Sequence, residues 1–120
     1  MKYPHSESLK KNRDFQLLYK EGKSRANRYL VLYVKENVLE KNRLGVSVSK
    51  KVGNSIVRHR ITRLIRESYR LHEEMFESGL DIVVICRVNA KNASYHEIEH
   101  ALLGLAKKHG IVVENEKKME

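Results

Sequence analysis

The chain has 120 residues, with 24 lysines and arginines against 15 acidic residues, and a formal net charge of +9. This length allows one domain with a modest hydrophobic core, and the longest apolar run, IVVIC at 82–86, is too short to span a membrane. The excess of positive charge is typical of proteins that bind a polyanion such as nucleic acid. The N-terminal residues lack the apolar stretch of a secretory signal, so we expect a cytoplasmic protein.

The spacing of apolar residues predicts alternating helices and strands. The expected elements are a helix over 12–20, strands over 29–35 and 44–49, a helix from about 55 to beyond 72 and a strand over 81–87. A last helix is expected over 95–109, with Ser94 as its N-cap. We expect a single domain over 1–120 with flexible polar ends at about 1–11 and 113–120. Cys86 is the single cysteine of the sequence, which excludes an internal disulfide. It lies in the apolar strand and is expected to be buried.

The expected second helix is strongly basic. Segment 50–70, KKVGNSIVRHRITRLIRESYR, contains Glu67 as its single acid. At 100° per residue, its arginines share one half of the helix, and the opposite half carries an apolar set with one serine: Val57, Ile61, Leu64, Ile65, Ser68 and Leu71. A solvated face would normally mix charge signs to form i,i+4 pairs. Because arginine binds phosphate through paired hydrogen bonds, the pattern favours nucleic-acid binding over a merely solvated face.

The connection before this helix is polar and positively charged. Lys50 and Lys51 precede Gly53, and Asn54 or Ser55 is placed to cap the helix. Free amides at a helix start beside two lysines form an anion site. The Gly53-Asn54 pair is also typical of a simple turn, and the two interpretations are compatible.

A second candidate surface is aromatic. Phe15 and Tyr19 lie one helical turn apart, and strand alternation places Tyr29, Val31 and Tyr33 on one face. If the first helix lies alongside that face, these side chains line a groove flanked by Lys10, Lys11, Arg13, Lys20 and Arg25. Aromatic side chains among cations suit unpaired bases, which stack on them. A helix and a strand that exchange aromatic side chains also build ordinary core, and the pattern alone leaves both interpretations open.

The sequence offers no evident catalytic or metal site. His96 and His100 stand four residues apart on the last helix, a spacing that can bind zinc, but no cysteine or further histidine lies close in sequence. We interpret them as surface residues. Paired carboxylates, a glycine-rich phosphate loop and a Ser/His/Asp order do not stand out, so any chemistry is expected to reside on a partner.

Four segments resemble parts of the protein subunit of bacterial ribonuclease P. The stretch SVSKKVGNSIVRHRITRLIRE at 47–67 resembles that family's RNR signature of paired lysines, a Gly-Asn pair and arginines on one helix. ANRYLVLY at 26–33, KNRDFQLLYKEGK at 11–23 and the apolar strand at 82–86 also match, so the resemblance covers nearly the whole chain. Two positions depart from the family pattern: His59 replaces the usual Asn between two arginines, and Thr62 replaces a common Lys.

The resemblance implies an α/β fold, a two-layer α+β arrangement with a four-stranded sheet flanked by helices, similar to the second domain of ribosomal protein S5. It also implies a left-handed β-α-β crossover, against the usual handedness rule. The implied enzyme is a ribonucleoprotein endonuclease in which RNA, with Mg²⁺ held mainly by that RNA and the substrate, hydrolyses precursor tRNA to give the mature 5′ end. The protein subunit would contain no catalytic residue, and its partners would be RNA, without a membrane or an obligate protein partner.

The resemblance also implies two sets of RNA-binding residues. The residues implied to face the catalytic RNA are Lys50, Lys51, Asn54, Arg58, Arg60, Arg63 and Arg66. The residues implied to hold the single-stranded 5′ leader of precursor tRNA are Phe15, Tyr19, Tyr29, Val31 and Tyr33.

Two other classes of protein share parts of this pattern. A ribosomal or ribonucleoprotein-assembly protein would have the charge and the basic helix but would not need an aromatic groove. A helix-turn-helix regulator would use Arg60–Arg70 as its recognition helix. It also needs a preceding helix, where this sequence predicts a strand with alternating Leu44, Val46 and Val48.

Overall fold

The computed structural model describes residues 5–113. Its elements in chain order are β1 (Ser6–Ser8), α1 (Asn12–Glu21), β2 (Lys23–Ala26), β3 (Leu30–Glu36), β4 (Asn42–Ser47), α2 (Ser55–His72), the 3-10 turn η1 (Glu73–Met75), β5 (Leu80–Cys86), the 3-10 turn η2 (Val88–Ala90) and α3 (Tyr95–His109). The six predicted elements are therefore confirmed, and β1 and β2 are additions.

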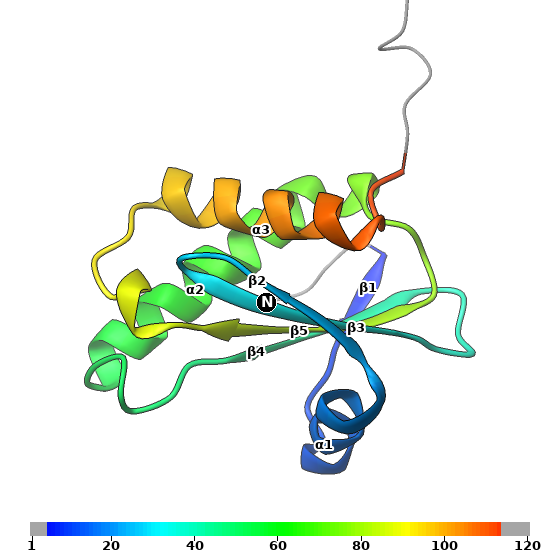
Figure 1. Cartoon of the computed structure of the whole chain (residues 1–120), viewed down its shortest axis with the longest axis horizontal. Coiled ribbons are helices and arrows are strands. Elements are labelled where there is room, and N and C mark those ends of the chain that lie inside the picture. The colour runs from blue at the N-terminus through cyan, green and yellow to red at the C-terminus, as the bar shows by residue number, and fades with distance from the viewer. Residues whose placement is uncertain (1–4, 114–120) are drawn as a thin grey trace, which may run out of the picture.

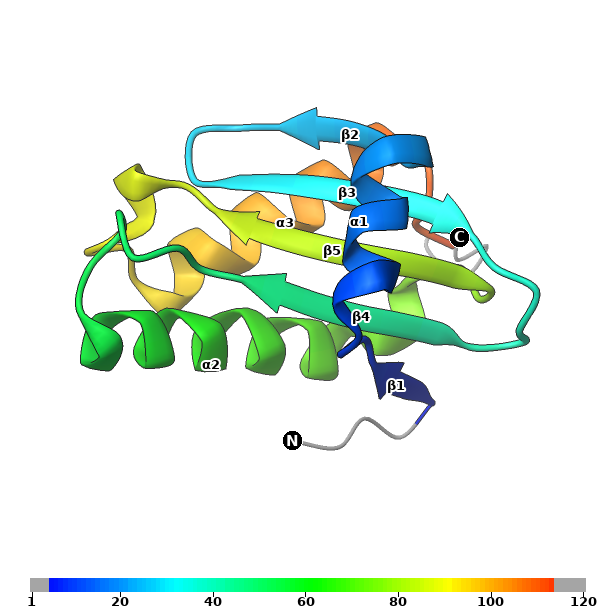
Figure 2. The ribbon, with the colours of Figure 1, turned by 90° about the horizontal axis from the view of Figure 1, so that it is seen from below.

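The strands form one mixed sheet in the order β1-β4-β5-β3-β2. Strands β1, β4 and β5 run parallel, whereas β3 is antiparallel to both β5 and β2. The crossover from β4 through α2 to the adjacent β5 is left-handed, as the resemblance implied. Figure 2 views the sheet from the side opposite α2, with α1 in front, and shows β4 and β5 side by side with the same direction.

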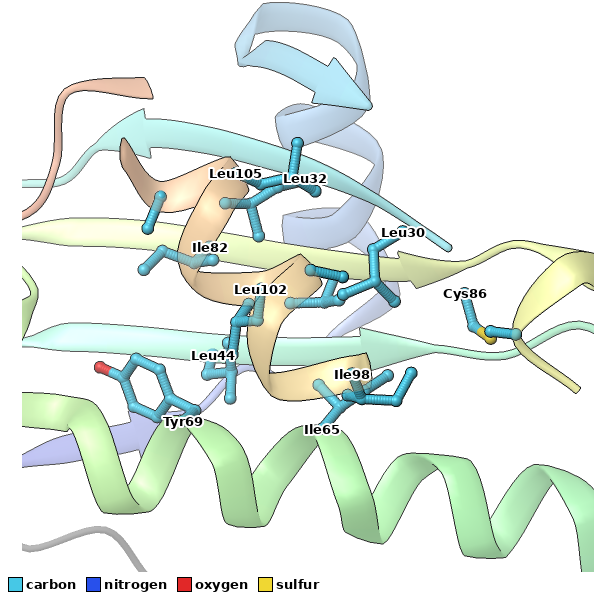
Figure 3. Packing of buried hydrophobic residues seen from close by; sticks show 14 of the residues in the cluster. Leu30, Leu32, Leu44, Ile65, Tyr69, Ile82, Cys86, Ile98, Leu102 and Leu105 are labelled. Atoms are coloured by element: carbon cyan, nitrogen blue, oxygen red, sulfur yellow. The ribbon is translucent and has the colours of Figure 1, made fainter. Parts of the chain in front are cut away.

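The two faces of the sheet are covered unequally. Helices α2 and α3 lie together on one face, and α1 lies alone on the other (Figure 1). The main core fills the space between the sheet and the two long helices, where Leu30, Leu32, Ile65, Ile82 and Leu102 are fully buried (Figure 3). A smaller cluster under α1 is built on Leu9, Leu18 and Val83. The sheet therefore has one well-covered face and one that a short helix covers only in part.

The last helix shows how local sequence fixes an element. The Ser94 side chain accepts a hydrogen bond from the Glu97 backbone N–H, and the Glu97 carboxylate accepts one from the Ser94 N–H, which completes a capping box. The helix ends at Gly110, whose φ of 71° lies in the left-handed region that glycine adopts at low cost. The predicted Ser94 cap is confirmed.

The expectation of a flexible N-terminal segment is wrong for residues 6–9. Ser6–Ser8 pairs with β4, and Leu9 is buried and donates its backbone N–H to the Leu44 carbonyl at 2.8 Å. The Ser6 and Tyr69 hydroxyls are also hydrogen-bonded at 2.8 Å. This strand escaped prediction because a three-residue polar edge strand has no apolar alternation of its own. Residues 1–4 and 114–120, which make up most of the ends expected to be flexible, lie outside the described residues.

Strand β2 was also not predicted, and together with β1 it gives five strands where the resemblance implied four. All four residues of β2 are exposed, and the strand is held by its antiparallel pairing with β3. Cys86 is buried as a free thiol, as predicted, and burial raises its pKa to about 11. Among residues 5–113 no helix is both long and apolar enough to cross a membrane.

Candidate nucleic-acid interface

The start of α2 combines a capped helix N-terminus with exposed lysines. The Asn54 side chain caps the helix by accepting a hydrogen bond from the Val57 N–H at 3.0 Å, which confirms one of the two predicted caps. Lys50 and Lys51 are exposed in the preceding turn, and buried Val52 anchors that turn to the core. The first helical turn contains no acidic residue. Two exposed ammonium groups thus stand beside the positive end of a helix, an arrangement suited to phosphate.

The arginines of α2 differ in what they contact. Arg63 is exposed, and Arg58 and Arg66 are half-buried. Arg60 is exposed too, but its guanidinium donates to the Ala93 carbonyl at 2.8 Å and so ties α2 to the segment before α3. This structural contact could not be inferred from the sequence. Arg60 is therefore a mixed site, partly structural and partly available to a ligand.

Farther along the helix, the single acid of the basic segment is already paired. Glu67 and Arg70 form an i,i+3 ion pair, and the hydrogen bond from Arg70 holds the pKa of the Glu67 carboxyl below its usual value. Arg70 is consequently less available to an outside anion than Arg63 or Arg66. The positive charge of α2 that remains without an acidic partner among the described residues lies along the helix from Arg58 to Arg66.

The opposite side of α2 packs on the core largely as predicted. Ile61, Ile65 and Ser68 are buried, and Val57 and Leu64 are partly buried. Leu71 departs from the prediction because it is 55% exposed. Tyr69 is buried near this end of the helix instead, with its hydroxyl bonded to Ser6 and within 3.3 Å of the Asn42 amide nitrogen. A helical wheel could not show this, because the contacts come from β1 and β4.

The two positions that depart from the family pattern lie on the basic side of α2. His59 is exposed and lines a shallow hollow with Ser55, Ile56, Arg60 and Arg63. Thr62 donates its hydroxyl to the Arg58 carbonyl at 2.8 Å within the helix. His59 is thus placed to reach a bound polyanion, whereas the Thr62 hydroxyl is used internally.

The structure brings three of the five predicted leader-binding residues into one aromatic cluster, defined here as Phe15, Tyr19 and Tyr33. The Phe15 and Tyr19 rings meet edge to face at 6.4 Å, and the Tyr19 and Tyr33 rings do so at 5.1 Å. All three side chains are half-buried rather than buried. Their exposed parts leave aromatic surface in contact with solvent beside the basic residues of α1, as a stacking platform requires.

Gly45 makes room for this cluster. A Cβ atom at position 45 would lie 2.5 Å from the Cζ of Phe15, closer than real contacts allow. The bare backbone of β4 therefore forms the floor on which the Phe15 ring rests. Sequence alone does not show that Gly45 accommodates a ring from α1, because Phe15 lies far from it along the chain.

The other two predicted leader-binding residues are separated by the sheet. Val31 alternates with the core residues Leu30 and Leu32 and so faces the α1 side, as predicted. Tyr29 does not share that face, because it precedes β3 and packs against the main core, with its hydroxyl donating to Glu97 of α3 at 2.9 Å. The prediction that Tyr29 lies on the same strand face as Val31 and Tyr33 is wrong.

An ion-pair network holds α1 in position over the sheet. Arg43 of β4 donates two hydrogen bonds to Asp81 of β5, at 2.8 and 2.6 Å, and its guanidinium lies 3.6 Å from Asp14 of α1. Burial alone would raise the pKa of Asp81. The hydrogen bonds from Arg43 and Asn37, with the Arg43 charge, outweigh burial and hold this pKa below its usual value. Asp14 directly precedes Phe15, so this network helps to place the aromatic ring.

Clusters able to bind a metal ion are absent from the described part of the chain. Residues 5–113 contain no group of three or more His, Cys, Asp and Glu side chains able to hold a metal ion. His96 and His100 are exposed on α3. His96 lies 3.9 Å from the Glu99 carboxylate, which also bonds to His72.

Known proteins share both the sequence and the fold. The family model for ribonuclease P matches residues 3–110. The ribonuclease P protein component of Lachnoclostridium phytofermentans is 60% identical over 111 residues, covering 92% of this chain and 96% of the relative. The chain belongs to the ribonuclease P protein family.

Solved structures of the ribonuclease P family have the same fold. The Staphylococcus aureus ribonuclease P protein superposes with a TM-score of 0.82 at 40% identity, covering 88% of this chain and 97% of its own. The Thermotoga maritima protein gives a TM-score of 0.79 at 34% identity, covering 91% and 99%. The matched range includes both the basic helix and the aromatic cluster. A ribosomal protein or a helix-turn-helix regulator is not favoured, and strand β4 precedes the basic helix where a regulator needs a helix.

Proposed function

We propose that this chain, as a protein component of ribonuclease P, binds RNA on two surfaces and so helps a catalytic RNA to cleave precursor tRNA at the mature 5′ end. The basic side of α2 from Arg58 to Arg66, with the lysine turn before it, contacts the catalytic RNA, and the aromatic cluster with Val31 holds the single-stranded 5′ leader. The observation that carries the proposal is the half-exposed cluster of Phe15, Tyr19 and Tyr33 on the incompletely covered face of the sheet.

The protein's part in the reaction is to bind and orient RNA. Stacking of leader bases on the aromatic rings would hold the substrate RNA in place near its cleavage site. This lowers the entropic cost of reaching the reactive geometry. The positive charge of α2 offsets phosphate repulsion between the two RNAs. In this proposal, Mg²⁺ is held mainly by the catalytic RNA and the substrate. The proposed setting is the cytoplasm, with RNA partners and no obligate protein partner.

The leader surface is tested by comparing substrates with and without a leader. Phe15→Ala or Tyr33→Ala is expected to weaken holoenzyme binding of precursor tRNA at least about fivefold, since stacking contributes roughly 1–3 kcal/mol per base. Binding of mature tRNA is expected to hardly change. Tyr95→Ala, on α3 and outside the cluster, is the matched control and is expected to leave the ratio of the two affinities unchanged. Equal losses for both tRNAs would show that the cluster is ordinary core.

The basic surface is tested on the catalytic RNA alone. The double variant Arg63→Ala/Arg66→Ala is expected to lose at least about tenfold in affinity, because charged hydrogen bonds contribute about 1.5–3 kcal/mol each. Its plot of log affinity against log salt is expected to flatten by about 1.4–1.8, at roughly 0.7–0.9 per lost phosphate contact. Arg70→Ala is the control on the same helix, since Arg70 already pairs with Glu67. An unchanged slope in the double variant would refute the phosphate contacts.

A further inference from the structure

A second hollow lies on the sheet face opposite the leader surface, between α3 and the turn that joins β2 to β3. It is lined by Arg28 and Tyr29 of the turn and by His100, Ala101, Gly104 and Lys108 of α3, among others. The same face of the molecule carries α2 and α3, with α1 on the other side of the sheet (Figure 1). This hollow is therefore separate from the surface formed by Phe15, Tyr19 and Tyr33.

The walls of the hollow are held in place by hydrogen bonds. The Asn27 side chain donates to the Ala101 carbonyl of α3 at 3.0 Å, and its oxygen accepts from the backbone N–H groups of Tyr29 and Leu30. The Tyr29 hydroxyl donates to Glu97 at 2.9 Å. The turn and the helix are thus fixed to one another, so the hollow is formed before any ligand binds, which reduces the ordering cost of binding.

The hollow is open above Gly104 of α3. A Cβ atom at Gly104 would have no other atom within 4 Å, so the packing of the chain does not require glycine here. Glycine in the interior of a helix costs about 0.5–1 kcal/mol relative to alanine. The open space over Gly104 is instead available to a flat ligand.

The chemistry of the walls suits an RNA nucleotide. The Arg28 guanidinium lies over the Tyr29 ring at 5.3 Å and is exposed, so it offers the planar cation on which unpaired bases stack. Lys108 and His100 on the helix side are exposed and can contact the flanking phosphates. The Glu97 carboxylate of the lining already accepts hydrogen bonds from Tyr29 and from the Ser94 N–H. The charge balance of the hollow therefore favours an anionic ligand.

We propose that the hollow between Arg28–Tyr29 and α3 is a second binding site for single-stranded RNA, one that takes an unpaired nucleotide with its base between Arg28 and Gly104. The nucleotide comes from the catalytic RNA or from the substrate, which present the same chemistry. Because the site lies on the face opposite the leader surface, one protein can contact two separate RNA segments at once.

The experiment is ultraviolet crosslinking of the full chain, with mapping of the crosslinked peptides, in the assembled holoenzyme. Crosslinks to the peptide that contains Arg28 and Tyr29, or to that of His100, are expected. If they form with the catalytic RNA alone, that RNA supplies the nucleotide; if they require added precursor tRNA, the substrate supplies it. Crosslinks that form only with a short free oligoribonucleotide, and in neither assembly, would overturn the proposal.

Two variants and a matched control connect the crosslink to the hollow. Gly104→Leu fills the open space and is expected to reduce crosslinking at this site about five- to a hundredfold, the range that loss of one stacked base gives. Gly104→Ala adds a single carbon to the same space and is the matched control, with an expected change below twofold. Arg28→Ala removes an exposed side chain without touching the helix and is expected to weaken the site as Gly104→Leu does.

Crosslinks to Phe15 or Tyr33 in the same samples report on the leader surface. They are expected to persist in all three variants, so a failure of the second site is distinguishable from a failure of the proposed function. Full crosslinking at Tyr29 in both Gly104→Leu and Arg28→Ala would refute the site even if the peptide itself is contacted by RNA.

Discussion

The two faces of the sheet carry similar side chains but bury them to different degrees. On the face of α2 and α3, helices of 18 and 15 residues enclose the core, and Leu30, Leu32 and Ile82 are fully buried. On the other face, the 10-residue α1 crosses the sheet at a steep angle (Figure 2) and leaves the aromatic cluster half-buried. Apolar surface that a short helix cannot cover is thereby left for a ligand, which connects the fold to RNA binding.

The largest difference in stability is expected between two neighbouring positions of β3, Leu32 and Val31, whose side chains point to opposite faces of the sheet. Leu32→Ala removes a fully buried side chain from the main core and is expected to lower the free energy of unfolding by about 2–5 kcal/mol. Val31→Ala, on the half-covered face, is expected to cost about 1 kcal/mol, because its side chain already contacts solvent. Urea denaturation measures both. Similar losses at the two positions would show that the faces are equally well packed.

A smaller effect is expected from the ion-pair network beneath α1. The pKa of Asp81 is lowered in the folded protein, so its ionised form stabilises the fold at pH above about 4, and this contribution is lost as the pH falls through the lowered pKa. Asp81→Asn is expected to lose roughly 1.5–3 kcal/mol at neutral pH, from weaker bonds to Arg43. It is also expected to show a flatter stability profile below pH of about 4.

The control for this profile is Glu40→Gln, which changes an exposed carboxylate in the turn between β3 and β4. Denaturation at a series of acidic pH values is expected to give this variant the same slope as the unaltered chain. If Asp81→Asn also keeps the full acid dependence, then the network does not stabilise the fold in the way described.

The smallest changes in stability are expected from two glycines on opposite faces of the sheet, Gly45 on the α1 side and Gly104 in α3. Gly45→Ala places a methyl group against the Phe15 ring and is expected to cost about 1–3 kcal/mol through overpacking. It is also expected to weaken precursor tRNA binding, since the ring must move. Gly104→Ala meets open space and is expected to stabilise the chain by about 0.5–1 kcal/mol through helix propensity. Thermal unfolding measures the stability of both variants. If Gly104→Ala lowered the stability, the space next to Gly104 could not be open as described.

The local sequence pattern was sufficient to predict those elements whose capping residues and apolar periodicity lie within the element itself. The Asn54 and Ser94 caps, the apolar strand around Val84 and the basic side of α2 were predicted because capping, alternation and helical periodicity involve residues close in sequence. The pairing of Phe15 and Tyr19 with Tyr33 was foreseen as one of two possibilities. Sequence could not choose between a groove and a core, because the choice depends on how much of the sheet α1 covers.

The features that only the tertiary structure decided depend on contacts between distant residues. Strands β1 and β2 exist because they pair with β4 and β3, although neither has an apolar pattern of its own. Tyr29 lies on the α3 side of the sheet, where its hydroxyl donates a hydrogen bond to Glu97. Tyr69 is buried where Leu71 was predicted to be, because hydrogen-bonding partners in β1 and β4 contact its hydroxyl. Periodicity assigns a residue to a face of its own element. Which elements meet that face is determined by the packing of the whole chain.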